Sequence, residues 1–371
     1  MMRTTRLGFA GLAALALAAP ATAEEFIHGS WFGVNHSVNT QGLEPYFDLL
    51  REESGGEIDW NLVPGAQLAS GPGTPEAVSS GLMDAGIAVA PYQPRMLPNT
   101  NFVFSHSLPG DDALAATGAM NETVMLGCPG CQQEYRDNNA VGFGGYSTTP
   151  YNFMCRDMVD SVDDLAGKKV RASGGGVTIT EIAGATPVSM SPAEATTALE
   201  RGTLDCVLGA VSWLRSYGYQ DVVESVVDSP MGMGGPPILM FVNRDTWESM
   251  TPEMRALHIE HAPDLVAGAA YDGQVSYDAG IIEAAKEQGV TFVEGGEDFA
   301  QVMATHDQNQ RAGNLEDAAA AGASGAEEVL DYYIAAYERW QGLLDERGRD
   351  RDAFRSLLWD EVYSKVDPDA L

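Results

Sequence analysis

The chain has 371 residues, with 53 Asp and Glu against 21 Lys and Arg, a formal net charge of −32 and 44% hydrophobic residues. This apolar content, with 13 Tyr, 12 Phe and 6 Trp, excludes a disordered chain and is enough for one large core or two ordinary ones. Because an acidic surface repels phosphate backbones and no Lys or Arg cluster offsets it, we expect no nucleic-acid partner.

The first 23 residues have the pattern of a secretory signal peptide. Arg3 and Arg6 precede an apolar run at 7–19, and Ala21-Thr22-Ala23 supplies the small residues of a cleavage site. The run is shorter than the ~20 residues that cross a bilayer, and no later stretch reaches that length. We therefore expect residues 1–23 to be removed and the mature protein to be exported to the periplasm.

Residues 24–145 alternate between strand and helix patterns and are expected to form mainly an N-terminal α/β lobe. The expected strands are 26–34, 58–63, 85–90 and 141–145, and the expected helices are 41–53, 111–126 and a short one opening at Thr74-Pro75. This βαβαβ order predicts a mostly parallel sheet with helices on both faces.

Residues 146–245 repeat the alternation and are expected to form mainly a C-terminal α/β lobe. The expected elements are strands at 151–155, 168–172 and 187–190, a helix at 176–183, and a helix capped by Ser191 with Pro192 in its first turn. Both lobes contain a Pro- and Glu-capped helix followed by Gly, Asp and a strand, at 75–90 and 192–211. We therefore predict two similar lobes that bind a ligand in the cleft between them.

The remainder, residues 246–371, has a strongly helical pattern. Helices are expected at 246–260, 263–289, 297–311, 327–345 and 352–363, with a strand at 290–294 and a loop or helix break in the Ala- and Gly-rich stretch 316–326. We expect this region to cross and pack on both lobes.

The four cysteines are Cys128, Cys131, Cys155 and Cys206, and export permits three full disulfide pairings among them. Cys128-Pro129-Gly130-Cys131 has the spacing of a thiol oxidoreductase site. A helix pattern precedes it in place of the strand such an enzyme needs, which favours a structural disulfide or an unreactive thiol pair. No second C-x-x-C or nearby His pair completes a zinc site.

The sequence has no catalytic signature. It lacks G-x-S-x-G, H-E-x-x-H, a Walker loop and a dinucleotide-binding glycine motif, and its six His are scattered. Ser173-Gly174-Gly175-Gly176 lacks the Lys-Ser/Thr pair of a phosphate-binding loop and is interpreted as a tight turn between strand and helix. We expect no enzyme activity, no metal and no cofactor.

Arg171 is the residue that stands out. It follows a strand and precedes three glycines, which places its guanidinium at the edge of a sheet facing the crevice. In an acidic chain such an arginine attracts an anion, and an Arg–carboxylate pair fixes its orientation. The alternative is a structural ion pair with Asp163 or Asp164, and the residues alone do not decide between the two.

Three segments carry a family resemblance. Asp163-Asp164-Leu165-Ala166-Gly167-Lys168-Lys169-Val170-Arg171, Gly184-Ala185-Thr186-Pro187-Val188, and Glu194 with 198–205 closely resemble the solute-binding proteins of TRAP transporters, DctP type. The likeness extends to 54–56, 64–68 and 242–247, and covers roughly 26–340 in the right order.

The resemblance implies a periplasmic receptor whose two α/β lobes, joined by crossing strands and a long helix, close on a small organic acid. The receptor would deliver this ligand to a two-component, sodium-driven membrane permease, acting as a monomer or dimer. The arginine that grips the ligand carboxylate in this family falls on Arg171. Receptors of ABC importers share the two-lobed design but lack the Asp-Leu-x-Gly-Lys-Lys-x-Arg segment.

Two departures from the family pattern bear on the ligand. The stretch 206–213 lacks the Asn or Glu-Trp pair of many members, which does not support sialic acid or ectoine. Some members carry a second polar or basic ligand residue about twenty positions before the arginine, where this chain has Thr149-Pro150-Tyr151-Asn152. One arginine with Tyr92, Tyr151 and Trp213 suits a monocarboxylate with an apolar or aromatic body. Asn35 and His36, with Trp31, are further candidates at the cleft edge of the N-terminal lobe.

Overall fold

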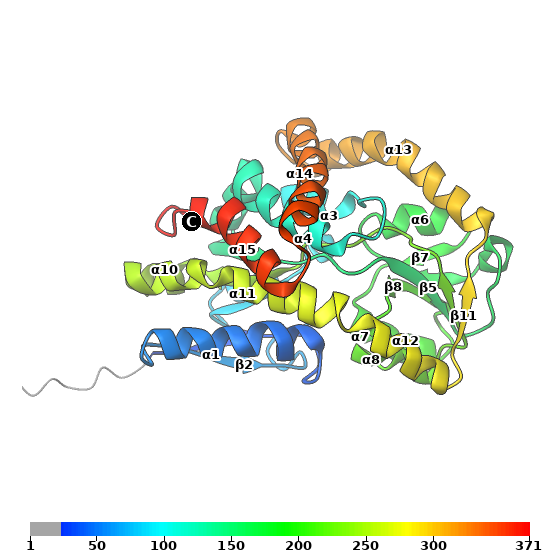
Figure 1. The fold of residues 1–371 in the computed structure, drawn as a ribbon, viewed down its shortest axis with the longest axis horizontal. Coiled ribbons are helices and arrows are strands. Elements are labelled where there is room, and N and C mark those ends of the chain that lie inside the picture. Colours follow the sequence, from blue (N-terminus) through cyan, green and yellow to red (C-terminus); the bar gives the residue numbers. More distant parts are fainter. Residues whose placement is uncertain (1–23) are drawn as a thin grey trace, which may run out of the picture.

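The computed structural model describes residues 24–371, so the expected signal peptide at 1–23 lies outside the described residues. Two α/β lobes lie side by side, and long helices run from one to the other along two sides of the molecule (Figure 1). The predicted two-lobed α/β architecture is therefore confirmed.

The N-terminal lobe contains a five-stranded sheet of order β2-β1-β3-β10-β4. Its strands are β1 (Glu24–Gly29), β2 (Ile58–Val63), β3 (Ala85–Ala88), β4 (Ala140–Gly145) and β10 (Ile238–Asn243). β1 pairs in parallel with β2 and β3, whereas β10 is antiparallel to both of its neighbours. The sheet is therefore mixed, and the prediction of a mostly parallel sheet is wrong, because β10 enters it from a distant part of the sequence. The first strand ends at Gly29, five residues earlier than expected, and β10 returns to this sheet from within 146–245.

The C-terminal lobe contains a six-stranded sheet of order β11-β9-β5-β8-β6-β7. Its strands are β5 (Tyr151–Cys155), β6 (Lys169–Arg171), β7 (Thr186–Val188), β8 (Cys206–Ala210), β9 (Ser225–Asp228) and β11 (Thr291–Glu294). β6 lies between the parallel partners β7 and β8, so its final residue, Arg171, is placed near the middle of the sheet edge.

The repeated Gly-to-Asp pattern forms the same turn in both lobes. Asp84, before β3, accepts a hydrogen bond from the Ile27 amide of β1 at 2.8 Å, and its own amide donates to the Ile27 carbonyl. Asp205, before β8, accepts one from the Lys169 amide of β6 at 2.8 Å, and its amide likewise donates to the Lys169 carbonyl. Each aspartate thereby ties the start of its strand to the neighbouring parallel strand.

The shorter helices cover the sheets. They are α1 (Glu44–Glu53), α2 (Thr74–Ser79), α3 (Pro98–Ser105), α4 (Ala113–Glu122), α5 (Pro129–Asp137), α6 (Gly176–Ile182), α7 (Pro192–Glu200), α8 (Trp213–Ser216), α9 (Arg244–Ser249) and α10 (Pro252–Glu260). The predicted cap of α7 is confirmed, since the Ser191 hydroxyl accepts from the Glu194 amide and the Glu194 carboxylate accepts from the Ser191 amide.

The expected single helix at 263–289 is wrong in its middle. α11 (Ala262–Ala267) leads into a π-helical segment, Gly268–Val275, before α12 (Asp278–Glu287). A side chain at Gly268 would collide with the backbone of Gln41, so this segment packs directly on a second π-helical turn, Val38–Leu43. Hydrophobic periodicity does not distinguish such wide turns from regular helix.

Three long helices complete the chain: α13 (Glu297–Ala321), α14 (Ala326–Arg347) and α15 (Arg351–Glu361). The expected break at 316–326 narrows to four residues, because α13 continues to Ala321 and ends at Gly322 with a left-handed φ of 84°. Phe299 of α13 belongs to the core of the C-terminal lobe, whereas Trp340 of α14 belongs to that of the N-terminal lobe. The helical region therefore packs on both lobes.

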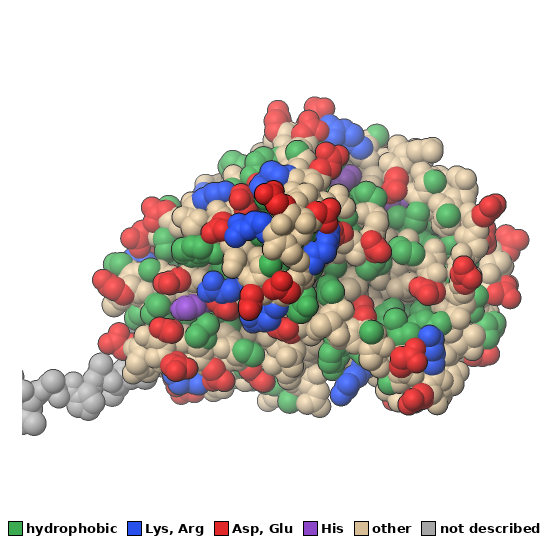
Figure 2. Space-filling model, viewed as in Figure 1, with side chains coloured by type: hydrophobic (Ala, Val, Ile, Leu, Met, Phe, Trp, Pro, Cys, Tyr) green, Lys and Arg blue, Asp and Glu red, His purple; other side chains and the backbone are tan. Residues whose placement is uncertain are grey.

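The surface in Figure 2 carries scattered Asp and Glu over both lobes, with the Lys and Arg residues gathered mainly over the C-terminal helices. Several of these arginines pair with acids, as Arg355 does with Asp264 at 3.0 Å and Arg351 with Asp272 at 2.7 Å. Within residues 24–371, no helix has the length and apolar character needed to cross a membrane.

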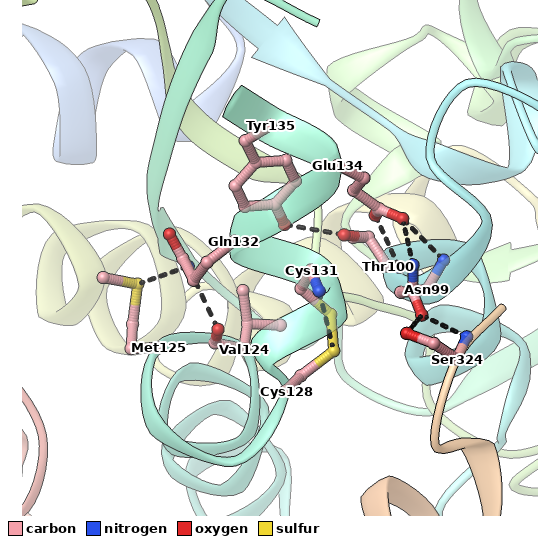
Figure 3. Close-up of a disulfide and its surroundings, with 10 residues drawn as sticks. All are labelled: Asn99, Thr100, Val124, Met125, Cys128, Cys131, Gln132, Glu134, Tyr135 and Ser324. Atoms are coloured by element: carbon pink, nitrogen blue, oxygen red, sulfur yellow. Dashed lines mark hydrogen bonds between the residues drawn. A yellow bond between two sulfur atoms is a disulfide. The ribbon is translucent and has the colours of Figure 1, made fainter. Parts of the chain in front are cut away.

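Each disulfide links two cysteines of the same lobe, one disulfide in each lobe. Cys155 and Cys206 face each other across the antiparallel pair β5 and β8, and Cys128 joins Cys131 at the start of α5 (Figure 3). Cys128 and Cys131 are buried, and Glu134 on the same helix accepts hydrogen bonds from the amides at the start of α3. This setting fits a structural disulfide, because both residues are buried at the start of a helix that packs on the core.

Candidate functional site

The candidate site is a cavity between the lobes, and side chains from both of them line it. The cavity volume is about 30 Å³, which leaves room for about one or two water molecules between the lobes. The lining is mostly aromatic and consists of Trp31, Phe32, Val89, Tyr92, Phe104, Tyr146, Thr148, Tyr151, Arg171, Ser173, Pro192, Trp213, Tyr217, Gly234 and Pro237.

Arg171 ends β6 and is 1% exposed. Its Nε donates to the carbonyl oxygen of Met190 at 2.8 Å, and its Nη2 lies 3.2 Å from the hydroxyls of both Tyr92 and Ser173. The guanidinium carbon lies 5.2 Å from the centre of the Trp213 ring, a cation–π distance. These contacts hold the guanidinium plane in one orientation.

No carboxylate within residues 24–371 neutralises Arg171. Its Nη1 has no hydrogen-bond partner there, and Asp164 instead caps the turn at Ser161. The structural ion pair weighed against a ligand role is therefore absent. A buried, unpaired charge is costly to a fold, which makes this guanidinium a ready site for an anion.

The glycine-rich segment after Arg171 brings the two lobes close together. Gly174 has a left-handed φ of 55°, and a Cβ on Gly175 would lie 2.7 Å from the carbonyl oxygen of Ser105. The predicted tight turn is confirmed, and glycine is required because the end of α3 passes against it. The turn thereby sets Arg171 beside Phe104 at the cavity wall.

Four of the six predicted site residues meet at the cavity: Arg171, Tyr92, Tyr151 and Trp213. The Tyr151 and Trp213 rings lie 5.4 Å apart on the C-terminal lobe. On the N-terminal lobe Tyr92 lies edge-on to Trp31 at 6.0 Å.

Asn35 and His36 lie outside the cavity lining. Asn35 is exposed. His36 is buried behind the wall, stacked on Phe32 at 4.0 Å and 5.3 Å from Tyr217. Burial lowers the pKa of His36 to about 3, so the ring is neutral.

Sequence reasoning did not single out Tyr146, Tyr217 and Phe104, which also line the cavity. Tyr146 directly follows β4, Tyr217 directly follows α8, and Phe104 lies in the last turn of α3. Each of the three is an aromatic residue near the end of a strand or helix. The sequence does not show which of these ends face the cleft, because that depends on how the lobes are assembled.

The cavity combines one positive charge with neutral phenols. Burial raises the pKa of Tyr92 to about 12 although the Arg171 guanidinium opposes the shift, and burial raises the pKa values of Tyr146, Tyr151 and Tyr217 as well. All four phenols therefore keep their protons at neutral pH. No group of three His, Cys, Asp or Glu side chains in the described residues is placed to hold a metal ion.

Two α/β lobes closed over a buried cavity define the class of periplasmic binding proteins. The model of the family "bacterial extracellular solute-binding protein, family 7" (DctP) matches residues 32–310. The chain therefore belongs to the DctP family, the solute-binding proteins of TRAP transporters, as the sequence resemblance predicted, and this family is non-enzymatic.

A curated relative, the uncharacterized protein YiiZ of Salmonella typhimurium, is 30% identical over 209 residues. This match covers 53% of the chain and spans 62% of the relative's length.

Solved TRAP solute-binding proteins share the fold. One from Rhodoferax ferrireducens, in complex with copurified benzoate, has a TM-score of 0.76 at 18% identity over 86% of this chain and 99% of its own. One from Bordetella bronchiseptica, with bound mandelate, has a TM-score of 0.72 at 20% identity, with coverages of 85% and 99%. A marine metagenome protein specific for aromatic acids, in complex with metahydroxyphenylacetate, has a TM-score of 0.74 at 22% identity and the same coverages.

Proposed function

We propose that this chain is a TRAP-transporter receptor that binds a small monocarboxylate at Arg171 and delivers it to the transporter's membrane subunits. The observation that carries the proposal is the guanidinium of Arg171, which is buried between the lobes with Nη1 unpartnered and no carboxylate beside it. A ligand carboxylate supplies the missing acceptor and the missing negative charge together.

The lining favours an aromatic or apolar body behind that carboxylate. The rings of Trp31, Tyr92, Tyr151 and Trp213 form flat walls on both lobes, and flat walls pack best against a flat ligand. Arg171 is the single cationic residue among the lining residues, so a second carboxylate would be left without a partner. Benzoate, mandelate and metahydroxyphenylacetate in the similar structures support the same ligand class.

Delivery to a membrane partner depends on closure. Tyr92 of the N-terminal lobe reaches Arg171 of the C-terminal lobe at 3.2 Å, so a carboxylate at Arg171 lies where both lobes meet. The closed receptor therefore differs in shape from the open one, and membrane subunits that recognise the closed shape receive loaded receptor. The signal pattern of 1–23 supports action in the periplasm.

A thermal-shift screen of the chain from Glu24 onward tests the receptor function. The panel contains aromatic monocarboxylates, keto acids, C4-dicarboxylates and sugar acids. A ligand at 100 times its Kd adds about 2.7 kcal/mol of stability, which raises Tm measurably. We expect stabilisation by aromatic monocarboxylates, and silence across all the acids would contradict the proposal.

Calorimetry on Arg171 variants then tests the site. Arg171→Ala removes the charge and is expected to weaken binding by about 100-fold or more, because a charged hydrogen-bonded pair is lost at a buried position. Arg171→Lys keeps the charge but not the planar fork, and is expected to retain an intermediate affinity. Unchanged binding by Arg171→Ala, with an unchanged melting curve, would contradict the assignment.

A further inference from the structure

The cavity contains more hydroxyl groups than its protein contacts use. Tyr92 pairs with Arg171, and the nearby Tyr219 donates to the carbonyl oxygen of Pro192 at 2.5 Å. By contrast, the hydroxyls of Tyr146 and Tyr217 form no hydrogen bond to any group in residues 24–371, although both side chains line the cavity.

Tyr146 and Tyr217 reach the cavity from different lobes. Tyr146 follows β4 and belongs to the core of the N-terminal lobe, whereas Tyr217 follows α8 of the C-terminal lobe. Both side chains line the same cavity as Arg171, and both phenols are neutral because burial raises their pKa values.

Packing fixes the position of the Tyr217 ring. It lies 5.7 Å from Trp213, perpendicular to it, and 5.3 Å from His36 behind the wall. The His36 Nδ1 accepts from the Val38 amide, which keeps that nitrogen unprotonated and holds the imidazole in place. The phenol of Tyr217 is thus presented to the cavity by a rigid support rather than by a mobile loop tip.

Phenylalanine at these two positions would supply the same apolar surface without the hydroxyls. Phe32 and Phe104 supply such surface elsewhere in the same cavity. A hydroxyl that lines a cavity without a protein partner is left to bond water or a bound molecule, so Tyr at both positions offers two polar groups to a ligand.

We propose that Tyr146 and Tyr217 form a second polar subsite that selects aromatic monocarboxylates carrying a ring hydroxyl over the unsubstituted acids. The ligand's carboxylate binds Arg171, its ring lies between the aromatic walls, and its hydroxyl exchanges hydrogen bonds with the two phenols. This inference rests on the proposed receptor function and adds the determinant of selectivity. A site built to hydrogen-bond a hydroxyl discriminates against analogues that lack it, because its own polar groups are then unpaired.

Matched pairs of acids test the subsite on the unmodified receptor. Benzoate is compared by calorimetry with 3- and 4-hydroxybenzoate, and phenylacetate with its 3- and 4-hydroxy derivatives. We expect at least one hydroxylated acid to bind about 10-fold more tightly than its parent, as one or two buried hydrogen bonds allow. If no hydroxylated acid binds more tightly than its parent, the inference is overturned.

Tyr146→Phe and Tyr217→Phe then locate the effect. Each variant is expected to reduce the ratio of the affinities for the hydroxylated acid and its parent about 3- to 10-fold, because only the hydroxylated acid loses a hydrogen bond. Tyr219→Phe is the matched control, because it removes a hydroxyl that Pro192 already satisfies and should leave the preference unchanged. An unchanged preference in both test variants would contradict the subsite.

The outcomes separate this inference from the proposed function. Binding of the parent acids that depends on Arg171, without any hydroxyl preference, contradicts only the subsite. Binding of a non-aromatic acid alone also contradicts the subsite and leaves the receptor function in place. Silence across all the carboxylates contradicts the receptor function itself.

Discussion

The two lobes share a scaffold but contribute different chemistry to the cleft. Asp84 and Asp205 make the same hydrogen bonds to the strand beside them, in equivalent turns of the two sheets. At the cavity, however, the N-terminal lobe supplies Trp31 and Tyr92, whereas the C-terminal lobe supplies the charge of Arg171. The repeated part of the sequence builds the frame, and the residues near the strand ends make the two cavity walls chemically different.

Because the lobes contribute different side chains, we expect them to contact different parts of a ligand. In the proposed receptor, the unpaired guanidinium of the C-terminal lobe attracts the anion, and aromatic side chains of the N-terminal lobe cover it. The Tyr92 hydroxyl makes a direct polar contact between the two lobes, because it accepts a hydrogen bond from Arg171 across the cleft.

The largest difference in stability is expected when the disulfide of one lobe or the other is removed. Cys155 and Cys206 are 51 residues apart in the sequence, whereas Cys128 and Cys131 are only three apart. Loop-closure entropy predicts a loss of about 4 kcal/mol for Cys155→Ala with Cys206→Ala, and of less than about 2 kcal/mol for Cys128→Ala with Cys131→Ala. Denaturant unfolding of the two double variants measures both losses, and equal losses would show that chain entropy does not govern them.

Replacement of Asp84 or Asp205 tests whether the two equivalent turns contribute equally to the free energy of unfolding. Asp205→Ala is expected to cost about 1–3 kcal/mol, since a strand amide loses its charged acceptor. Asp84→Ala should cost somewhat more, because Asp84 also accepts from the Thr246 hydroxyl at 2.8 Å. The Asn variants keep an oxygen acceptor and serve as controls in the same unfolding series. A negligible loss of stability at either position would show that the two turns do not stabilise the fold in the same way.

Tyr92→Phe isolates the hydroxyl that joins the lobes. We expect about 5-fold weaker carboxylate binding, equivalent to about 1 kcal/mol, with little change in the Tm of the ligand-free protein. Calorimetry and a thermal melt measure the two effects. Tyr332→Phe, which removes a hydroxyl bonded to Glu122 instead, is the remote control. If Tyr92→Phe binds ligand as tightly as the unmodified protein, the cross-cleft contact contributes nothing to capture.

A smaller effect is expected at the start of α12, on the segment that crosses between the lobes. Burial raises the pKa of Asp278 to about 6, and the Thr149 hydroxyl opposes the rise only in part. A raised carboxyl pKa means that ionisation destabilises the fold, so the penalty is absent below about pH 4 and complete above about pH 6. Asp278→Asn should therefore raise stability by about 1 kcal/mol at pH 7.5, with the gain vanishing toward pH 4. Thermal melts at several pH values measure this gain, and a gain independent of pH would contradict its electrostatic origin.

The sequence predicted the frame of the molecule well because that frame follows local rules. Alternating strand and helix patterns gave both sheets, and the Ser191 cap and the Gly-to-Asp turns formed as expected. The π-helical segment Gly268–Val275 was missed, because its cause is close packing against Gln41, far away in the sequence.

The candidate site was predicted in part. Arg171, Tyr92, Tyr151 and Trp213 all reach the cavity, and each lies at or near the end of a strand or short helix. Tyr146 and Tyr217 were not found, because their positions depend on how the lobes close rather than on any local pattern. Their contribution to ligand selection, like that of Arg171 to ligand capture, is a prediction for the experiments above.

The Cys155–Cys206 link restrains the segment that positions Arg171. The loop that it closes includes both Arg171 and Met190, whose carbonyl oxygen orients the guanidinium. A covalent closure removes conformations that would carry these two residues apart, so the disulfide and the hydrogen bond restrain the same segment.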